Sequence, residues 1–303
     1  MKLLMFKHDG ETRLGALRPG HEDEVVDLSG VAPDLLAVID AGDPGLARVR
    51  SALSSSSSKA HKLADLELLA PLDPPRGNVI AIGRNYQKHA EESARKEGYE
   101  PQPPTIFTKA ITSLTEPFAD IAIDPSVSEQ IDWEAELAIV IGKRGANIKR
   151  ADARGHIFGY TVINDVTARD IQNGWGGQYF KGKSLDRSSP TGPWVVTSDE
   201  VHDPQSLSVQ LRLNGTLEQD GNTRDMIYPV DAIIEWASKG MTLLPGALIA
   251  TGTPDGVGHY RTPPEYLHPG DVMETEVVGI GLLRNRIVAA KVGALADHPH
   301  RGA

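Results

Sequence analysis

The chain has 303 residues, of which 40% are hydrophobic and 24% charged, an ordinary globular composition with room for a large and a small domain. Its formal net charge of −10 argues against a nucleic-acid partner, which normally requires a basic face. The absence of cysteine excludes disulfides, thiolate metal sites and a cysteine nucleophile. Neither a signal peptide nor an apolar run of about 20 residues that could span a membrane is found, so we expect a cytoplasmic protein without a membrane partner.

The first part of the chain predicts a small α+β unit. Short strands are expected at residues 2–6 and 12–19, and a short helix near residues 33–40. A serine run follows at Ser54–Ser58, and then the proline-rich segment PLDPPRGN, which is typical of a linker. We therefore place a small N-terminal domain at residues 1–72, a catalytic domain at 73–293 and a disordered tail at 294–303.

The larger domain is predicted to be mainly β, of the mixed α+β class. Apolar runs indicate strands separated by Gly, Pro and Asp turns, at residues 78–83, 131–142, 157–165, 194–201, 207–215, 247–253 and 272–281. Helices are expected at residues 85–97 and 229–239, the second as a single longer helix among the later strands. The regular strand–helix alternation of a doubly wound sheet is missing.

An acidic strand is the first candidate site. In the segment IDWEAELAIVI, alternation places Asp132, Glu134 and Glu136 on one face of the strand. Such carboxylates need solvent, a basic partner or a metal cation, and the outward face of an edge strand is the simpler alternative. Asp165 ends the apolar run GYTVIND, where strand ends commonly carry site residues. Three carboxylates without cysteine suit Mg²⁺ or Mn²⁺.

The segment Gly177–Ser184 matches the phosphate-loop pattern GxxxxGK[ST]. A phosphate loop must follow a buried strand and open a helix, whereas here a polar, glycine-broken stretch precedes it and Pro190 and Pro193 follow. A nucleotide-binding enzyme is therefore only a remote alternative. Lys183 keeps a second interpretation, because a lysine near a carboxylate-held metal can pair with a substrate carboxylate or oxyanion.

His89 and Glu92 lie three residues apart on the helix expected at 85–97, so they share one face and can form a hydrogen bond. Such a pair can act as a general base near neutral pH. The alternative is an exposed, charged helix with an incidental pair. Its composition, followed by Gly98 and several prolines, also suits a mobile lid.

Together these motifs resemble the fumarylacetoacetate hydrolase (FAH) family, in particular its acylpyruvase, oxaloacetate decarboxylase and sugar-acid-degrading branches. The matching segments lie in order between about residues 77 and 290: IGRNYQKHAEE, FTKAITSLTEP, IDWEAELAIVIGKR, GYTVINDVTARDIQ, FKGKSLDRSSPTGPW, NGTLEQDGNTRDMIY and IATGTPDGVG. The resemblance implies a mixed β-sandwich roll behind a small N-terminal domain, a homodimer, and bound Mg²⁺ or Mn²⁺.

The resemblance also implies roles for individual residues. The metal ligands would be Glu134, Glu136 and Asp165, and Lys183 would be the active-site lysine. His89 and Glu92 would form the water-activating pair. The substrate contacts would be Arg84, Tyr86, Arg169, Gln172 and Thr253.

The expected activity is metal-dependent hydrolysis of a C–C bond in a small 2,4-dioxo acid of the acylpyruvate type. Water activated by Glu92 and His89 would attack the distal carbonyl, and pyruvate would leave as its enolate while Lys183 helps to hold the negative charge. Decarboxylation of oxaloacetate, and keto–enol or double-bond isomerisation of the 2-hydroxymuconate type, remain open because they use the same enolate-stabilising site.

Overall fold

The computed structural model describes residues 1–55, 57–94 and 103–290. It confirms the expected class, a mainly β fold of mixed sheets with few helices. No helix within these residues is long and apolar enough to cross a membrane. The expected tail and the Gly98 region lie outside the described residues.

The described residues of the N-terminal part contain five strands and one long helix. The strands are β1 (Lys2–His8), β2 (Glu11–Arg18), β3 (His21–Asp27), β4 (Ala60–Lys62) and β5 (Glu67–Leu69). Helix α1 (Leu35–Ser54) extends well beyond the short helix expected there, and it is kinked at Gly42, whose φ is +57°. It begins at Asp34, whose side chain accepts a hydrogen bond from the Ala37 amide. The prediction that the helix near residues 33–40 is short is therefore wrong.

The larger part contains fourteen strands and three α-helices within the described residues. The strands are β6 (Val79–Gly83), β7 (Thr105–Lys109), β8 (Leu114–Thr115), β9 (Ile121–Ile123), β10 (Ile131–Asp132), β11 (Ala135–Ile141), β12 (Ile157–Asn164), β13 (Thr167–Ala168), β14 (Ser189–Thr197), β15 (Ser208–Leu213), β16 (Thr216–Asn222), β17 (Leu248–Ala250), β18 (Val272–Val277) and β19 (Gly281–Ala289). The helices are α2 (Gln87–Ala94), α3 (Arg169–Gly174) and α4 (Val230–Ser238). Short 3₁₀ helices also occur in the described chain, and one of them, η6 (Gly258–Tyr260), lies near the candidate site.

Most of the expected elements of this part are confirmed with shifted ends. The elements that were not expected are β7, β8, β9, β13, β16, β19 and α3. The prediction of one continuous strand at 131–142 is wrong. It is interrupted at Trp133 and Glu134, which belong to neither β10 nor β11.

Two sheets form the sandwich. The large one runs β4-β3-β2-β1-β14-β12-β11-β17-β6-β7, with β5 beside β1 and β8 beside β14, and the smaller one runs β16-β15-β18-β19-β9. Between them, Leu137, Ile139 and Ile141 of β11 share a hydrophobic core with Leu211 and Leu283 of the smaller sheet. Ala138 and Val140, on the other face of β11, belong to a second core that also contains α1 residues. Strand β11 is therefore buried on both faces.

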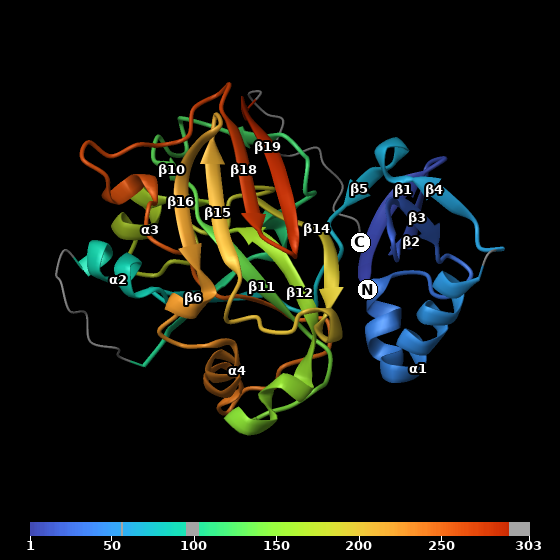
Figure 1. The fold of residues 1–303 in the computed structure, drawn as a ribbon. Coiled ribbons are helices and arrows are strands. Elements are labelled where there is room, and N and C mark those ends of the chain that lie inside the picture. Colours follow the sequence, from blue (N-terminus) through green and yellow to red (C-terminus); the bar gives the residue numbers. More distant parts are fainter. Residues whose placement is uncertain (56, 95–102, 291–303) are drawn as a thin grey trace.

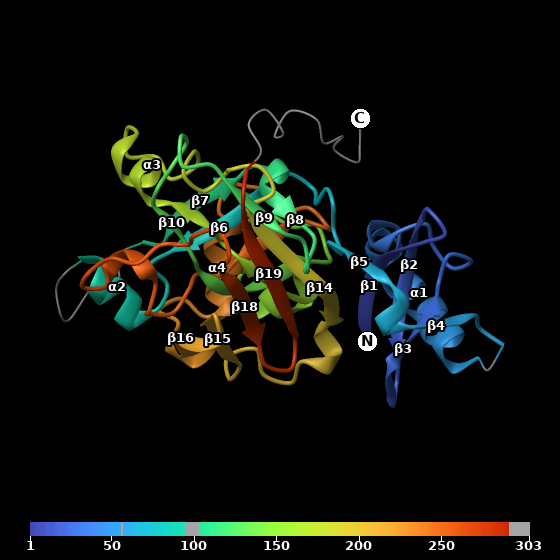
Figure 2. The ribbon, with the colours of Figure 1, turned by 90° about the horizontal axis from the view of Figure 1, so that it is seen from above.

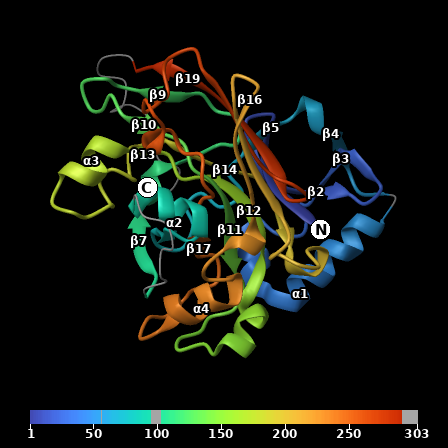
Figure 3. The ribbon, with the colours of Figure 1, turned by 60° about the vertical axis from the view of Figure 1, so that its left-hand side comes forward.

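The N-terminal strands continue the large sheet through β1, where Lys2 and Leu3 pair with Val196 and Val195 of β14. Figures 1 and 2 show these elements as a lobe on one side of the molecule, with α2 and α3 on the opposite side. In Figure 3, α2 lies near β7, β17 and α3. The boundary near residue 72 stays a prediction.

Candidate active site

Three buried carboxylates meet where β11 begins and β12 ends. Glu134 immediately precedes β11, Glu136 lies on it, and Asp165 follows β12; their ligand oxygens lie within 4.8 Å of one another. The pairing of Ala135 with Asn164 produces this arrangement, and it is fixed by the Asp165 amide, which donates to the Glu134 carbonyl at 2.9 Å. Since β11 pairs with β12 and β17, the edge-strand alternative is excluded.

Asp132 does not join this cluster, although alternation placed it on the same face. The chain leaves strand geometry at Trp133 and Glu134, so Asp132 points elsewhere. Its carboxylate accepts hydrogen bonds from Arg169 Nε at 2.8 Å and from the amides of Gly258 and His259 at 2.8 and 3.0 Å. It therefore connects α3 to η6.

Two buried lysines contact the cluster. Lys183 Nζ lies 2.7 Å from Glu134 Oε2 and 2.8 Å from Asp165 Oδ2, and Lys109 Nζ lies 2.5 Å from Asp165 Oδ1. Lys109 also donates to the backbone carbonyl of Lys183, which ties β7 to the loop before β14. Lys109 had no predicted role, although it lies in the quoted segment FTKAITSLTEP.

The charges of this region leave room for a cation. The region contains four buried carboxylates and three buried cations. The carboxylates are those of Asp132, Glu134, Glu136 and Asp165, and the cations are Lys109, Lys183 and Arg169. Glu136 forms no ion pair within the described residues, and its Oε2 accepts only from the Gly252 amide, at 2.7 Å. Burial, together with the charges of Asp165 and Glu134, raises the pKa of Glu136 well above its ordinary value. A buried all-oxygen site with excess negative charge fits a hard divalent cation.

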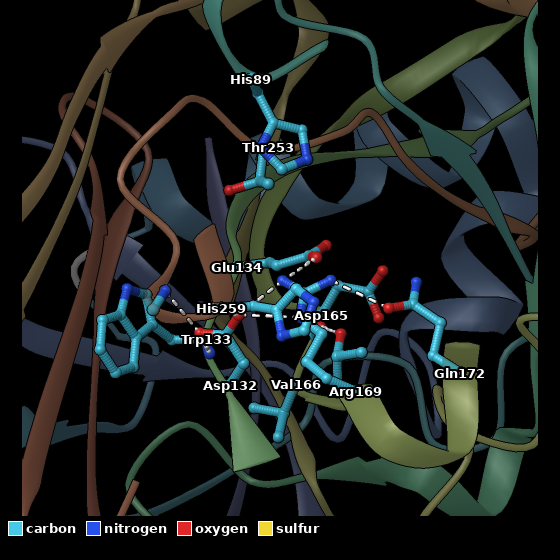
Figure 4. Close-up of polar contacts among 12 residues, drawn as sticks. His89, Asp132, Trp133, Glu134, Asp165, Val166, Arg169, Gln172, Thr253 and His259 are labelled. Carbon is cyan, nitrogen blue, oxygen red and sulfur yellow. Dashed lines mark hydrogen bonds and ion pairs between the residues drawn. The ribbon is translucent and has the colours of Figure 1, made fainter. Parts of the chain in front are cut away.

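Arg169 and Gln172 extend this site along α3. Arg169 Nη2 lies 2.7 Å from both Asp132 Oδ2 and Glu134 Oε1, and its Nη1 donates to Gln172 Oε1 at 3.0 Å. Figure 4 shows these contacts around Glu134. Burial would raise the pKa of Glu134, but Lys183, Arg169 and His89 together lower it below its ordinary value.

His89 and Glu92 form the expected pair on α2, with His89 Nδ1 2.9 Å from Glu92 Oε1. His89 is buried rather than exposed, so the incidental surface pair is excluded. A carboxylate at Nδ1 favours the tautomer in which Nε2 carries the lone pair.

One cavity brings most of the predicted residues together. Its walls include Arg84, His89, Glu134, Arg169, Gln172, Lys183 and Thr253. Arg84 adopts a φ of +55°, which is uncommon for a residue other than glycine and is often found at functional sites. Glu92, Glu136 and Asp165 do not line the cavity, and neither does Tyr86, whose buried hydroxyl has no hydrogen-bond partner among the described residues.

Gln219 supports the wall of the cavity at Thr253. The Thr253 hydroxyl donates to the Ala135 carbonyl at 2.9 Å and accepts from Gln219 Nε2 at 2.7 Å. Gln219 Oε1 in turn accepts from the Ala135 amide at 2.9 Å, so this buried side chain braces the start of β11. Tyr260 lines the cavity as well, and neither Gln219 nor Tyr260 was expected at this site.

The segment Gly177–Ser184 does not have the surroundings of a phosphate loop. It follows α3, and the next element after it is strand β14 rather than a helix. Lys183 is buried against carboxylates.

Comparison with known proteins agrees with this geometry. Residues 78–288 match the family model described as fumarylacetoacetate (FAA) hydrolase C-terminal. "Oxaloacetate tautomerase YisK" of Bacillus subtilis (strain 168) is 40% identical over 273 residues, covering 88% of this chain and 90% of the relative. The fumarylacetoacetate hydrolase EaFAH of Exiguobacterium antarcticum is 39% identical, with a TM-score of 0.80, covering 96% of this chain and all of that one.

A second similar structure contains a metal. Maleylpyruvate hydrolase of Sphingobium sp. SYK-6, solved with manganese(II) and pyruvate, is 28% identical with a TM-score of 0.80, covering 96% of this chain and all of that one. The family model spans well over half of the chain and the relatives cover nearly all of it. The chain is therefore an enzyme of the fumarylacetoacetate hydrolase family.

Proposed function

We propose that this enzyme interconverts the keto and enol forms of oxaloacetate or a similar small 2-oxo acid, using a divalent cation. The observation that carries the proposal is the single cavity in which Glu134, in the carboxylate cluster, faces Lys183, Arg169 and His89. The relative named oxaloacetate tautomerase, at 40% identity, supports this reaction over the others.

The cation would be Mg²⁺ or Mn²⁺, held by Glu134, Glu136 and Asp165. When bound, it would supply Lewis acidity toward the carboxylate and keto oxygens of a 2-oxo acid. It would also turn the excess negative charge of the region into a net positive charge, which attracts an anionic substrate.

The chain's own residues would move the proton. His89, oriented by Glu92, takes a proton from C3 through Nε2, and the electrons of that C–H bond form the C2–C3 double bond. Lys183 stabilises the negative charge that develops on the C2 oxygen, and the His89 imidazolium returns its proton to that oxygen. Arg169, held by Asp132 and Gln172, is placed to pair with a substrate carboxylate.

Hydrolysis of an acylpyruvate is the second candidate, and the His89–Glu92 pair at the cavity favours it, because the same pair can activate water. The roles of Arg84, Gln172 and Thr253 as substrate contacts belong to either proposal, since all three line the cavity. Tyr86 does not line the cavity, so we propose only that its buried side chain supports the cavity wall from behind. A homodimer in the cytoplasm stays part of the proposal.

The test follows the ultraviolet absorbance of enol-oxaloacetate and, separately, pyruvate release from oxaloacetate and from acylpyruvates. Each reaction is run with Mg²⁺, with Mn²⁺ and with EDTA, on the wild type, on His89→Ala and on the control His202→Ala, an exposed histidine. Tautomerisation that needs metal and falls about 100-fold in His89→Ala supports the proposal. Acylpyruvate cleavage that collapses in the same variant, without tautomerisation, would establish the hydrolase instead. Decarboxylation of oxaloacetate that survives it would establish a decarboxylase.

A further inference from the structure

Three aromatic side chains line the cavity: Phe107, Tyr179 and Tyr260. Phe107 and Tyr179 contact each other edge to face, with ring centroids 5.4 Å apart, and the Phe107 ring lies 5.3 Å from Lys183 Nζ. This group therefore stands beside the carboxylate cluster, which Lys183 contacts directly.

Tyr260 lines the cavity beside His89 and Arg169 rather than beside Lys183. Its ring lies 6.0 Å from the His89 ring and 5.9 Å from the guanidinium carbon of Arg169. A 2-oxo acid whose carboxylate and keto oxygens lie at the carboxylate cluster would extend its remaining atoms toward His89 and Arg169. Those atoms would meet the ring of Tyr260.

The turn that carries Tyr260 is held rigidly. The Gly258 and His259 amides donate to the buried Asp132 carboxylate, and the His259 ring packs edge to face on Tyr260 at 4.9 Å. A Cβ atom added at Gly258 would lie 2.0 Å from the Glu265 carbonyl oxygen, so the backbone is closely packed there. The backbone that carries Tyr260 is consequently fixed by Asp132, and the His259 ring packs against one side of the Tyr260 ring.

We propose that Tyr260 is a specificity-determining residue whose ring limits the length of the group attached to the 2-oxo carbon of the substrate. The inference rests on the proposed function in that a 2-oxo acid occupies the cavity. Short distal groups, such as that of oxaloacetate, fit between His89 and Tyr260, whereas longer chains collide with the ring. The hydroxyl stays neutral, since burial raises the pKa of Tyr260, and so the ring rather than a charge sets the limit.

The test measures binding of two unreactive 2-oxo acid analogues, oxamate and N-butyloxamate, to the Mn²⁺-loaded protein by calorimetry. The wild type should bind oxamate at least about 10-fold more tightly. Tyr260→Ala should reduce this preference by about 10-fold or more, and Tyr260→Trp should increase it. Tyr260→Phe keeps the ring and should stay within about threefold of the wild type.

Tyr266→Ala is the matched control. Its hydroxyl lies 3.0 Å from His259 Nδ1 on the same loop, but it does not line the cavity, so the preference should not change. An unchanged preference in both Tyr260→Ala and Tyr260→Trp would overturn the inference. Because binding does not depend on turnover, a wild type that prefers oxamate yet fails to tautomerise oxaloacetate would refute the proposed reaction alone.

Discussion

The ammonium group of Lys109 lies 2.5 Å from Oδ1 of Asp165, and neither side chain has any exposed surface. Lys183 contacts the other oxygen of the same carboxylate at 2.8 Å. Asp165 is thus held between two cations from different parts of the chain, one on β7 and one in the loop before β14. Burial lowers the pKa of Lys109, and the nearby Asp165 opposes that effect.

Lys109→Met should destabilise the protein, because it leaves a buried carboxylate with one cation fewer. Breaking a buried ion pair from one side costs about 3–5 kcal/mol in free energy of unfolding. Urea denaturation in the presence of EDTA measures the loss, and Mn²⁺ should restore part of it by binding beside Asp165. The same substitution at the exposed Lys181 should change little. Equal unfolding midpoints for Lys109→Met and the wild type would contradict the assignment.

The carboxylate cluster was predictable from the sequence because its members lie on or beside strands with strong apolar patterns. Lys109 was not, since its role depends on β7 joining β6 at the edge of the sheet, which no local pattern reveals. Strand β19 was missed for another reason. Its inward position 285 carries a buried asparagine, bonded to the carbonyls of Pro117 and Ala119, and a polar residue there interrupts the apolar alternation.

The break at Trp133 and Glu134 shows where periodicity fails. The sequence alternates without interruption through Asp132, Glu134 and Glu136, yet Asp132 is drawn toward Arg169 and η6. Those partners lie at least 37 residues away in the chain, and the only local contact beside them among the described residues is the Trp133 amide, which donates to Asp132 Oδ1 at 2.8 Å. The competing interactions are therefore mainly tertiary. A charged residue whose partners are distant can therefore override local strand geometry.

Glu136→Gln should have opposite effects on the metal-free and the metal-bound protein. Without metal, the substitution removes a buried carboxylate that has no cation partner in the described structure, so stability should be unchanged or greater. Affinity for Mn²⁺ should nevertheless fall by about 100-fold or more, because one negative ligand is lost. Thermal unfolding with EDTA and titration with Mn²⁺ measure the two effects.

Glu67→Gln, at an exposed position on β5, serves as the control for that substitution. A Glu136→Gln protein that binds Mn²⁺ like the wild type would remove Glu136 from the ligand set. Marked destabilisation in EDTA would show instead that the carboxylate has a structural partner.

Asp27 gives the N-terminal part an acid-sensitive contribution to stability. Burial alone would raise its pKa, but hydrogen bonds from Ser29 and Arg13 outweigh it and lower the pKa to about 2. A depressed folded-state pKa stabilises the protein above the unfolded-state value, and this stabilisation is lost as the pH falls through the folded-state pKa. The wild type should therefore lose stability relative to Asp27→Asn between about pH 4 and pH 2. Asp9→Asn, at an exposed turn, should follow the wild type, and parallel pH curves for wild type and Asp27→Asn would contradict the prediction.

Asp132→Asn should weaken substrate binding more than it slows the reaction. The Asp132 carboxylate contacts Arg169 Nε at 2.8 Å and Arg169 Nη2 at 2.7 Å. An asparagine amide of the same shape has only one acceptor oxygen and no charge. Arg169 and η6 should consequently become less well positioned. We expect KM for oxaloacetate to rise about 10-fold or more while kcat falls less, the pattern of lost binding rather than lost transition-state contact.

Mn²⁺ binding separates this role from that of a ligand. Because Asp132 lies outside the three-carboxylate cluster, its substitution should leave Mn²⁺ affinity near that of the wild type. Asp170→Asn is the matched control, since Asp170 lies in the first turn of α3, which also carries Arg169, but accepts a hydrogen bond from Ser128 Oγ at 2.6 Å. Loss of Mn²⁺ binding in Asp132→Asn would place this carboxylate among the ligands. Wild-type KM in the same variant would mean that Arg169 keeps its position without Asp132, held by Glu134 and Gln172 alone.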